Sequence, residues 1–250
     1  MSYLFHVIFY QPILNLVVFL YNIIPGADLG IAIIVLTIII KLALYPLTKK
    51  SLQGQKALQD MQPKIDELKK KYAGKQDEMG RAMLELYKEN KVNPFSSCLP
   101  LLIQLPFLWA VFKVLRSSLN AEALNALYPF IHRPEIINTT LFGFTDLSKP
   151  NIILAVLAGV AQFWQAKSMM TKKPVVKGEG STDENMAAIM NKQMMYMMPV
   201  LTVVIGWKLP GGLTLYWFVM TLVQVLQQYW MFRKKKDTIQ TVIEGEVIKK

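Results

Sequence analysis

The sequence predicts an all-α polytopic membrane protein with five transmembrane helices, a cytoplasmic helical hairpin and an N-terminal interfacial helix. First, 53% of the 250 residues are hydrophobic, only 18% are charged, and the mean hydropathy is +0.30, which is more apolar than soluble domains of this size. Second, several apolar runs reach the roughly 18 residues that a helical bilayer crossing needs. Third, most Lys and Arg residues fall between and after these runs.

Four apolar runs are long enough to cross a bilayer as helices, and they occupy residues 29–47, 95–115, 152–170 and 213–232. A shorter run, residues 194–209, is joined to the last one through Pro210, Gly211 and Gly212. Proline and glycine end one helix and permit a tight reversal. We therefore expect transmembrane helices at residues 29–48, 95–116 and 151–170, and a transmembrane hairpin of two helices at residues 194–232.

The N-terminal residues 1–28 contain one more apolar run, which is interrupted by His6, Gln11, Asn15 and Asn22. This run has no basic segment before it and no small-residue cleavage site after it, so it does not resemble a removable signal peptide. We interpret it as a helix that lies in the membrane interface on the extracytoplasmic side. A sixth span is the alternative.

The positions of Lys and Arg predict the orientation. Residues 49–94 carry 11 of them, residues 167–193 carry 5 and residues 233–250 carry 6, which is 22 of the 28 in the chain. Basic residues accumulate on the cytoplasmic side of membrane proteins. We therefore expect cytoplasmic segments at 49–94, 171–193 and 233–250, and extracytoplasmic segments at 1–28 and 117–150. Five spans satisfy this alternation, whereas six would break it.

The cytoplasmic segment 49–94 has the pattern of two helices folded back on each other. Apolar residues recur at three- and four-residue steps, stop at Ala73-Gly74-Lys75, and then resume. One interpretation is a solvated hairpin that packs only on itself. The other is a docking surface for a partner or substrate, formed by Met61, Ile65, Leu68, Met79 and Met83.

Polar side chains inside the spans are costly and are therefore candidate functional residues. Thr37 and Lys41 are four residues apart in the first span and share a helix face. Gln104 lies in the second span, and Gln162, Trp164 and Gln165 lie in the third. If these faces converge, they line a hydrated cavity. The alternatives are a Lys41 side chain that snorkels toward the headgroups and glutamines that hydrogen-bond one helix to another.

The sequence offers little for catalysis. His6, His132 and Cys98 are the only histidines and cysteine, and they lie far apart in the predicted topology. There is no GxxxxGK loop. We expect no enzyme activity, no metal and no cofactor. A channel or secondary transporter with Lys41 as an anion site is the rival class, although the spans show no internal repeat.

Several motifs, in order along the chain, resemble those of the YidC family of membrane protein insertases, which is related to mitochondrial oxidase-assembly and chloroplast albino proteins. These motifs are "MQPKIDELKKKY", "LYKENKVNPFSSCLPLLIQLPF", "MMYMMPV" and "LPGGLTLYW". The resemblance implies a membrane protein insertase and chaperone of the prokaryotic plasma (inner) membrane. It would insert and help fold newly made membrane proteins without hydrolysing ATP itself.

The resemblance also implies a hydrophilic groove that is enclosed by the five helices, open to the cytoplasm and to lipid, and closed toward the outside. Lys41 matches the single positive residue of the family's first core span, where arginine is usual. A guanidinium keeps its charge more firmly than an ammonium does. Thr37 and Tyr216 match positions of substrate contact, and Gln104 matches a polar groove position. Gln162, Trp164 and Gln165 are further lining residues.

The implied partners are nascent membrane proteins with few spans, together with the ribosome, a Sec-type translocon and membrane lipid. We expect no DNA partner, because the net charge of +11 comes mainly from the cytoplasmic flanks. The basic start of the tail at residues 233–236 fits anchoring against anionic lipid, and contact with ribosomal RNA is the alternative. We expect no large extracytoplasmic domain and no lipid-modified N-terminal cysteine.

Overall fold

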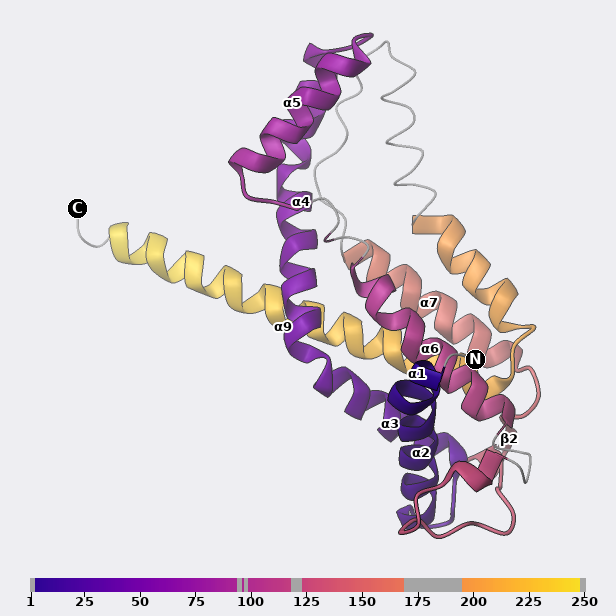
Figure 1. Cartoon of the computed structure of the whole chain (residues 1–250). Helices are drawn as coiled ribbons and strands as arrows, with labels where there is room; N and C mark the ends of the chain where they lie inside the picture. Colours follow the sequence, from indigo (N-terminus) through magenta and orange to yellow (C-terminus); the bar gives the residue numbers. More distant parts are fainter. Residues whose placement is uncertain (1–2, 94–95, 97–98, 118–122, 169–194, 248–250) are drawn as a thin grey trace.

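The computed structural model describes residues 3–93, 96, 99–117, 123–168 and 195–247 (Figure 1). Most of these residues are helical. A bundle of helices carries a projecting helical hairpin at one end and a short β-hairpin at the other (Figure 1). The predicted cytoplasmic loop 171–193 and Cys98 lie outside the described residues.

The N-terminal helix runs from Tyr3 to Ile23 and consists of α1 (Tyr3–Phe5), the π-helical η1 (His6–Tyr10) and α2 (Gln11–Ile23). By length and apolar composition it is a candidate membrane span, although part of its surface is buried inside the protein. It packs against α3 and α6. The interfacial placement and the sixth span therefore both remain compatible with this helix, and the five-span count remains a prediction.

The first predicted span is a shorter helix than the sequence suggested. Helix α3 (Leu29–Ala43) ends before α4 (Tyr45–Lys71), and the two axes differ by 69°. Pro46 occupies the first turn of α4, where its missing N–H costs no helical hydrogen bond. At the other end, Asp28 caps α3 by accepting a hydrogen bond from the N–H of Ile31 at 2.9 Å. Residues 44–48 thus belong to the bend and to α4.

Helices α4 and α5 (Gln76–Glu89) form the projecting hairpin (Figure 1). Met61 and Ile65 are buried, whereas Leu68, Met79 and Met83 are half-buried. Pro63 lies inside α4, which continues on both sides of it.

The remaining helices are α6 (Leu99–Ser117), α7 (Ile152–Ser168), the helix Met195–Gly206 and α9 (Gly211–Val247). Between α6 and α7, the short 3-10 helix η3 (Ala123–Ala126) precedes two antiparallel strands, β1 (Thr140–Leu141) and β2 (Thr145–Asp146). Strand β1 pairs Thr140 with Asp146 and Leu141 with Thr145. The backbone of α9 stays helical past residue 232 into the predicted tail.

Contacts between the helices show their relative directions. Gly206 lies against Ala155 and Thr214, near the starts of α7 and α9, and Ser168 at the end of α7 bonds to Gln228 far along α9. Helices α7 and α9 therefore run in the same direction. The helix Met195–Gly206 runs against them, and a Cβ added at Gly159 of α7 would clash with it. Gly159 thus permits a close helix crossing.

The apolar core lies where α2, α3, α6 and α9 meet. Its most deeply buried side chains include Leu14, Ile33, Leu36, Val111 and Val114. The glycines that start α9 serve this packing, because a Cβ at Gly212 would lie 3.2 Å from the Ile33 Cδ1 atom and 3.3 Å from the Leu115 Cδ1 atom. The core therefore fixes the start of α9 beside α3 and α6.

Candidate functional site

A buried lysine joins α3 to α9 in the interior of the bundle. Lys41 lies near the end of α3, is only 5% exposed, and donates a hydrogen bond from Nζ to Oε1 of Gln224 at 2.9 Å. Gln224 is 8% exposed. A snorkelling side chain would instead extend along the helix surface. The ammonium therefore lies between the two helices.

Lys41 has no carboxylate partner in the part of the chain that the structure describes. Ion pairs among the described residues include Lys56 with Asp60, Lys75 with Glu78 and Lys149 with Asp146, each between residues close together in sequence. A charge taken out of water without an opposite charge beside it is costly. The partner of the Lys41 ammonium among the described residues is therefore the neutral amide of Gln224.

A second polar cluster lies one turn further along α9. Gln228 is buried, and its Oε1 accepts a hydrogen bond from the Ser168 Oγ of α7 at 2.7 Å. The Nε2 of Gln228 and the Oε1 of Gln227 are buried without a hydrogen-bond partner among the described residues. Buried amide groups normally have a partner or an ordered water. The face of α9 that bears Gln224 and Gln228 therefore has unused hydrogen-bonding capacity.

Tyr216 and Gln104 form a third polar contact, between α9 and α6. The Gln104 Nε2 donates to the Tyr216 hydroxyl at 2.6 Å, and the Tyr216 side chain is almost completely buried. Tyr216 precedes Gln224 by eight residues on the same helix, which is a little over two turns and about 12 Å along its axis at the usual rise. Thr37 is also buried, but its hydroxyl donates to the Ile33 carbonyl of its own helix at 2.6 Å.

The three predicted groove residues of the third span, Gln162, Trp164 and Gln165, all lie on α7. Gln162 accepts a hydrogen bond from the Thr202 hydroxyl of the helix Met195–Gly206. This contact joins two helices, as one sequence interpretation of the glutamines expected. The Trp164 side chain is 56% exposed. Gln165 is half-buried, and its backbone carbonyl shares the hydroxyl hydrogen of Ser168 with the Gln228 Oε1 atom.

The sequence analysis missed Gln224, Gln227 and Gln228. Gln224 and Gln228 are four residues apart in the last apolar run and so share a helix face. This is the spacing by which Thr37 and Lys41 were recognised, so the same rule applied to the last run would have identified these two glutamines.

This arrangement is that of a helical membrane protein whose interior holds a lysine and several amides. Two of the buried amide atoms, Gln227 Oε1 and Gln228 Nε2, have no hydrogen-bond partner among the described residues. The chain belongs to the 60Kd inner membrane protein family, whose model matches residues 19–238. Curated relatives of this chain are bacterial proteins named membrane protein insertase YidC. Mostly helical structure and membership of an insertase family were both expected from the sequence, and both are confirmed.

Two of these relatives and one solved structure show how far the likeness extends. A Fusobacterium nucleatum insertase is 36% identical over 207 residues, which cover 83% of this chain and 87% of that protein. A Geobacter sulfurreducens insertase is 33% identical over 223 residues, which cover 89% of this chain but 37% of that protein. The structure described as an active YidC insertase with its first transmembrane domain resolved is 27% identical. It matches with a TM-score of 0.60 over 90% of this chain and 46% of that chain.

Proposed function

We propose that this chain is a membrane protein insertase and chaperone that inserts newly made membrane proteins and helps them fold. It acts through a hydrophilic groove that opens to the cytoplasm and to lipid, and it does not itself hydrolyse ATP. The observation that carries the proposal is the buried Lys41, whose ammonium donates a hydrogen bond to the neutral amide of Gln224 at 2.9 Å. Family membership and the names of the curated relatives support it.

The physical barrier in insertion is the passage of a client's polar tail through the apolar bilayer. A cation inside the bundle attracts acidic residues of that tail, with a Coulomb energy of roughly 4 kcal/mol for a carboxylate 4 Å away at an effective dielectric constant of about 20. Each carboxylate moved outward also gains roughly 2.3 kcal/mol per 100 mV of inside-negative potential. The client's own apolar span then partitions into lipid. The attraction to the cation, the membrane potential and the partitioning of the apolar span together supply the driving force, so insertion does not need ATP hydrolysis.

The remaining groove residues are assigned by the same proposal. We assign Lys41 to the client's carboxylates, and Thr37, Gln104 and Tyr216 to contacts with its polar backbone and side chains. Gln162, Trp164 and Gln165 complete the lining on the third span. Amide and hydroxyl groups suit this role because they can exchange hydrogen bonds with water and with a passing chain.

The topology in this proposal has five spans, an extracytoplasmic N-terminus and a cytoplasmic C-terminus. The relative helix directions support it, because α7 and α9 run the same way and the helix Met195–Gly206 runs against them. The cytoplasmic hairpin then offers the surface of Met61, Ile65, Leu68, Met79 and Met83 to clients or partners. The ribosome and a Sec-type translocon are the partners that this placement allows.

The direct test is insertion of a single-span client with an acidic N-terminal tail into liposomes that contain the purified chain, scored by protease protection. Wild type and Lys41→Arg should insert the client, whereas Lys41→Ala should not. Lys208→Ala is the matched control, because Lys208 is an exposed lysine outside α3. This control should insert like wild type.

Two results would contradict the proposal at different levels. If wild type adds nothing over empty liposomes, the chain is not an insertase for such clients. If wild type inserts and Lys41→Ala inserts equally well, the groove works without its cation, and hydration rather than charge lowers the barrier.

A further inference from the structure

We propose that the tip of the β-hairpin, Phe142-Gly143-Phe144, is a lipid anchor that inserts its aromatic side chains into the extracytoplasmic membrane interface. The inference rests on the membrane placement proposed above. The tip lies at the start of α3, the opposite end of that helix from Lys41, and no role assigned so far uses it.

The first observation is exposure. The Phe142 side chain is 61% exposed and the Phe144 side chain is 92% exposed. Both rings therefore contribute little to the core, although aromatic side chains are among the largest sources of apolar burial in proteins. Adjacent exposed apolar side chains mark an interaction surface more often than isolated ones do.

The second observation is the backbone. Phe142 has φ 54° and Gly143 has φ 75°, and the Phe144 N–H bonds to the Leu141 carbonyl at 3.2 Å. This is the pattern of a turn that prefers Asn, Asp or Gly at both central positions. A phenylalanine in the left-handed region is strained. Its exposed ring gains no internal packing that would offset this strain. A contact outside the chain therefore explains the phenylalanine better than packing within the protein does.

The third observation is that the hairpin is fixed to α3. The Asp28 Oδ2 atom accepts a hydrogen bond from the Phe142 N–H at 2.5 Å, while its Oδ1 atom caps the helix. Leu141 lies so close to Gly30 that a Cβ there would be 2.7 Å from the Leu141 Cβ atom. The tip is therefore held in a defined position and pays little ordering entropy when it meets a partner.

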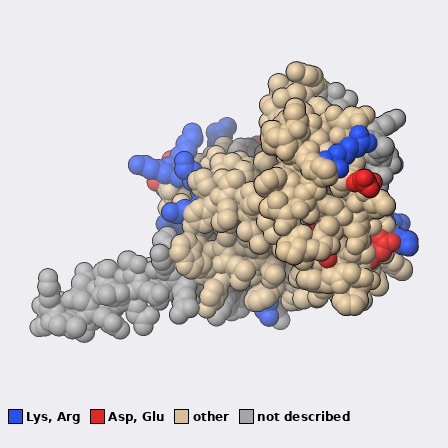
Figure 2. Space-filling view, turned by 90° about the horizontal axis from the view of Figure 1, so that it is seen from below, with Lys and Arg blue, Asp and Glu red and all other residues tan. Residues whose placement is uncertain are grey.

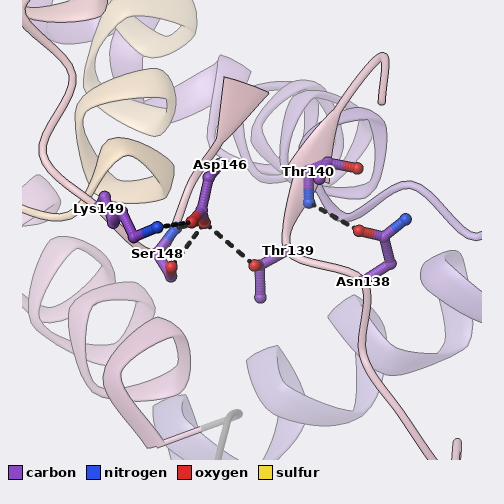
Figure 3. A network of polar contacts seen from close by, with 6 residues as sticks. All are labelled: Asn138, Thr139, Thr140, Asp146, Ser148 and Lys149. Atoms are coloured by element: carbon purple, nitrogen blue, oxygen red, sulfur yellow. Dashed lines mark hydrogen bonds and ion pairs between the residues drawn. The ribbon is translucent and has the colours of Figure 1, made fainter. Parts of the chain in front are cut away.

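The base of the hairpin is fixed as well (Figure 3). Asp146 accepts hydrogen bonds from the Thr139 hydroxyl at 3.2 Å and the Ser148 N–H at 2.9 Å, and it forms an ion pair with Lys149 at 3.1 Å. The hydrogen bonds from Ser148 are the main reason that the pKa of Asp146 is lowered to about 2. Its carboxylate therefore stays charged, and the base stays assembled, across the physiological range.

The position of the tip favours lipid over a protein partner. The carbonyls of Leu147 and Lys149, just after the hairpin, accept hydrogen bonds from the N–H groups that start α9. At this same end Ile153 of α7 and Trp207 after the helix Met195–Gly206 are both more than half exposed. Seen from this end, most of the surface is uncharged, and the Lys, Arg, Asp and Glu side chains gather mainly toward its sides (Figure 2). Trp residues at span ends sit preferentially in the interface, and Phe side chains transfer favourably into the membrane, so we infer that one lipid-facing surface continues onto the tip.

The test is nitroxide labelling of the full chain in liposomes, with Cys98→Ser as the background. Three single-cysteine variants are compared, namely Phe144→Cys at the tip, Val160→Cys on the exposed face of α7 and Glu135→Cys in the exposed loop. Collision with oxygen reports lipid, and collision with a water-soluble nickel chelate reports water. The label at 144 should favour oxygen more than the label at 135 and less than the label at 160.

The outcomes separate the anchor from the membrane placement. If the label at 160 favours oxygen while the label at 144 has the same accessibility as the label at 135, the tip lies in water and the proposed anchor is wrong. If 144 becomes shielded from both reagents only when a client is added, the tip binds protein, which also overturns the lipid assignment. If 160 itself reports water, the membrane placement of α7 fails and the anchor fails with it.

Discussion

Replacing Gln224 by Glu would put a carboxylate where the amide oxygen now accepts the hydrogen bond from Lys41. Glu and Gln have nearly the same shape, so the change adds charge with little change in volume. At the observed Nζ–Oε1 distance of 2.9 Å, the attraction amounts to roughly 6 kcal/mol at an effective dielectric constant of about 20. A client carboxylate would have to compete with this internal partner for the ammonium.

We therefore expect Gln224→Glu to reduce insertion of an acidic-tailed client as strongly as Lys41→Ala does. Gln224→Leu removes the amide and adds no charge, so it should cost about 1.5–3 kcal/mol of stability through the lost hydrogen bond to a charged group, while leaving Lys41 open to the client. The assay is protease protection in liposomes, run in parallel with a client whose tail is neutral. That neutral-tailed client should insert equally well with wild type and Gln224→Glu.

The refuting result is full insertion of the acidic-tailed client by Gln224→Glu at wild-type protein levels. Since an internal carboxylate beside Lys41 would then have no effect, the client would not depend on the free charge of that lysine. If Gln224→Glu instead blocks both clients equally, the substitution has damaged the bundle rather than neutralised the cation.

Three further predictions concern other parts of the structure. Gly159→Val should lower the free energy of unfolding in detergent by about 1–3 kcal/mol, because its side chain would overpack the crossing of α7 with the neighbouring helix; Gly80→Val, where a Cβ meets nothing within 4 Å, is the control and should show only a small propensity effect. Asp28→Ala should cost about 1–2 kcal/mol through the lost cap and the lost hairpin contact, and an unchanged denaturation midpoint would contradict this. The pKa of Asp146 is depressed to about 2, so its support of the hairpin is complete above its ordinary pKa of 3.8 and is lost as the pH falls toward 2. Pepsin should cleave beside Phe144 faster at pH 2 than at pH 3.5 after normalisation to a peptide substrate, and equal rates would refute this.

The helices could be predicted from the sequence because their signals are local. Apolar runs, capping residues such as Asp28 and breakers such as Pro210 each act within a few neighbours along the chain. The bend after Ala43 was missed, because the run continues apolar through Leu47 and only Pro46 marks a new first turn.

The partners of the site residues could not be predicted, because they depend on contacts across the bundle. Lys41 and Gln224 are 183 residues apart in sequence, and nothing local in either segment specifies the other. Gln104 and Tyr216 were each singled out as groove residues, but their hydrogen bond to each other required the packing of α6 on α9.

The polar residues of the N-terminal helix can be explained in two ways. In the sequence they favour an interfacial helix over a membrane span, and in the structure they also hold the loop between α6 and α7. Asn15 and Asn22 donate hydrogen bonds to the carbonyls of Ala126 and His132, and the Asn138 N–H donates to the Tyr21 hydroxyl. Polar groups that hold a loop do not decide whether the helix lies in the interface or crosses the bilayer.

The sharp bend between α3 and α4 has a mechanical consequence. Only three residues separate Lys41 from the first residue of α4, so a force on the far end of α4 acts with a long lever on the last turn of α3. A small tilt of the arm would rotate that turn and change how far the ammonium lies from Gln224. A partner that binds the hairpin would thus change the position of the Lys41 ammonium without contacting Lys41.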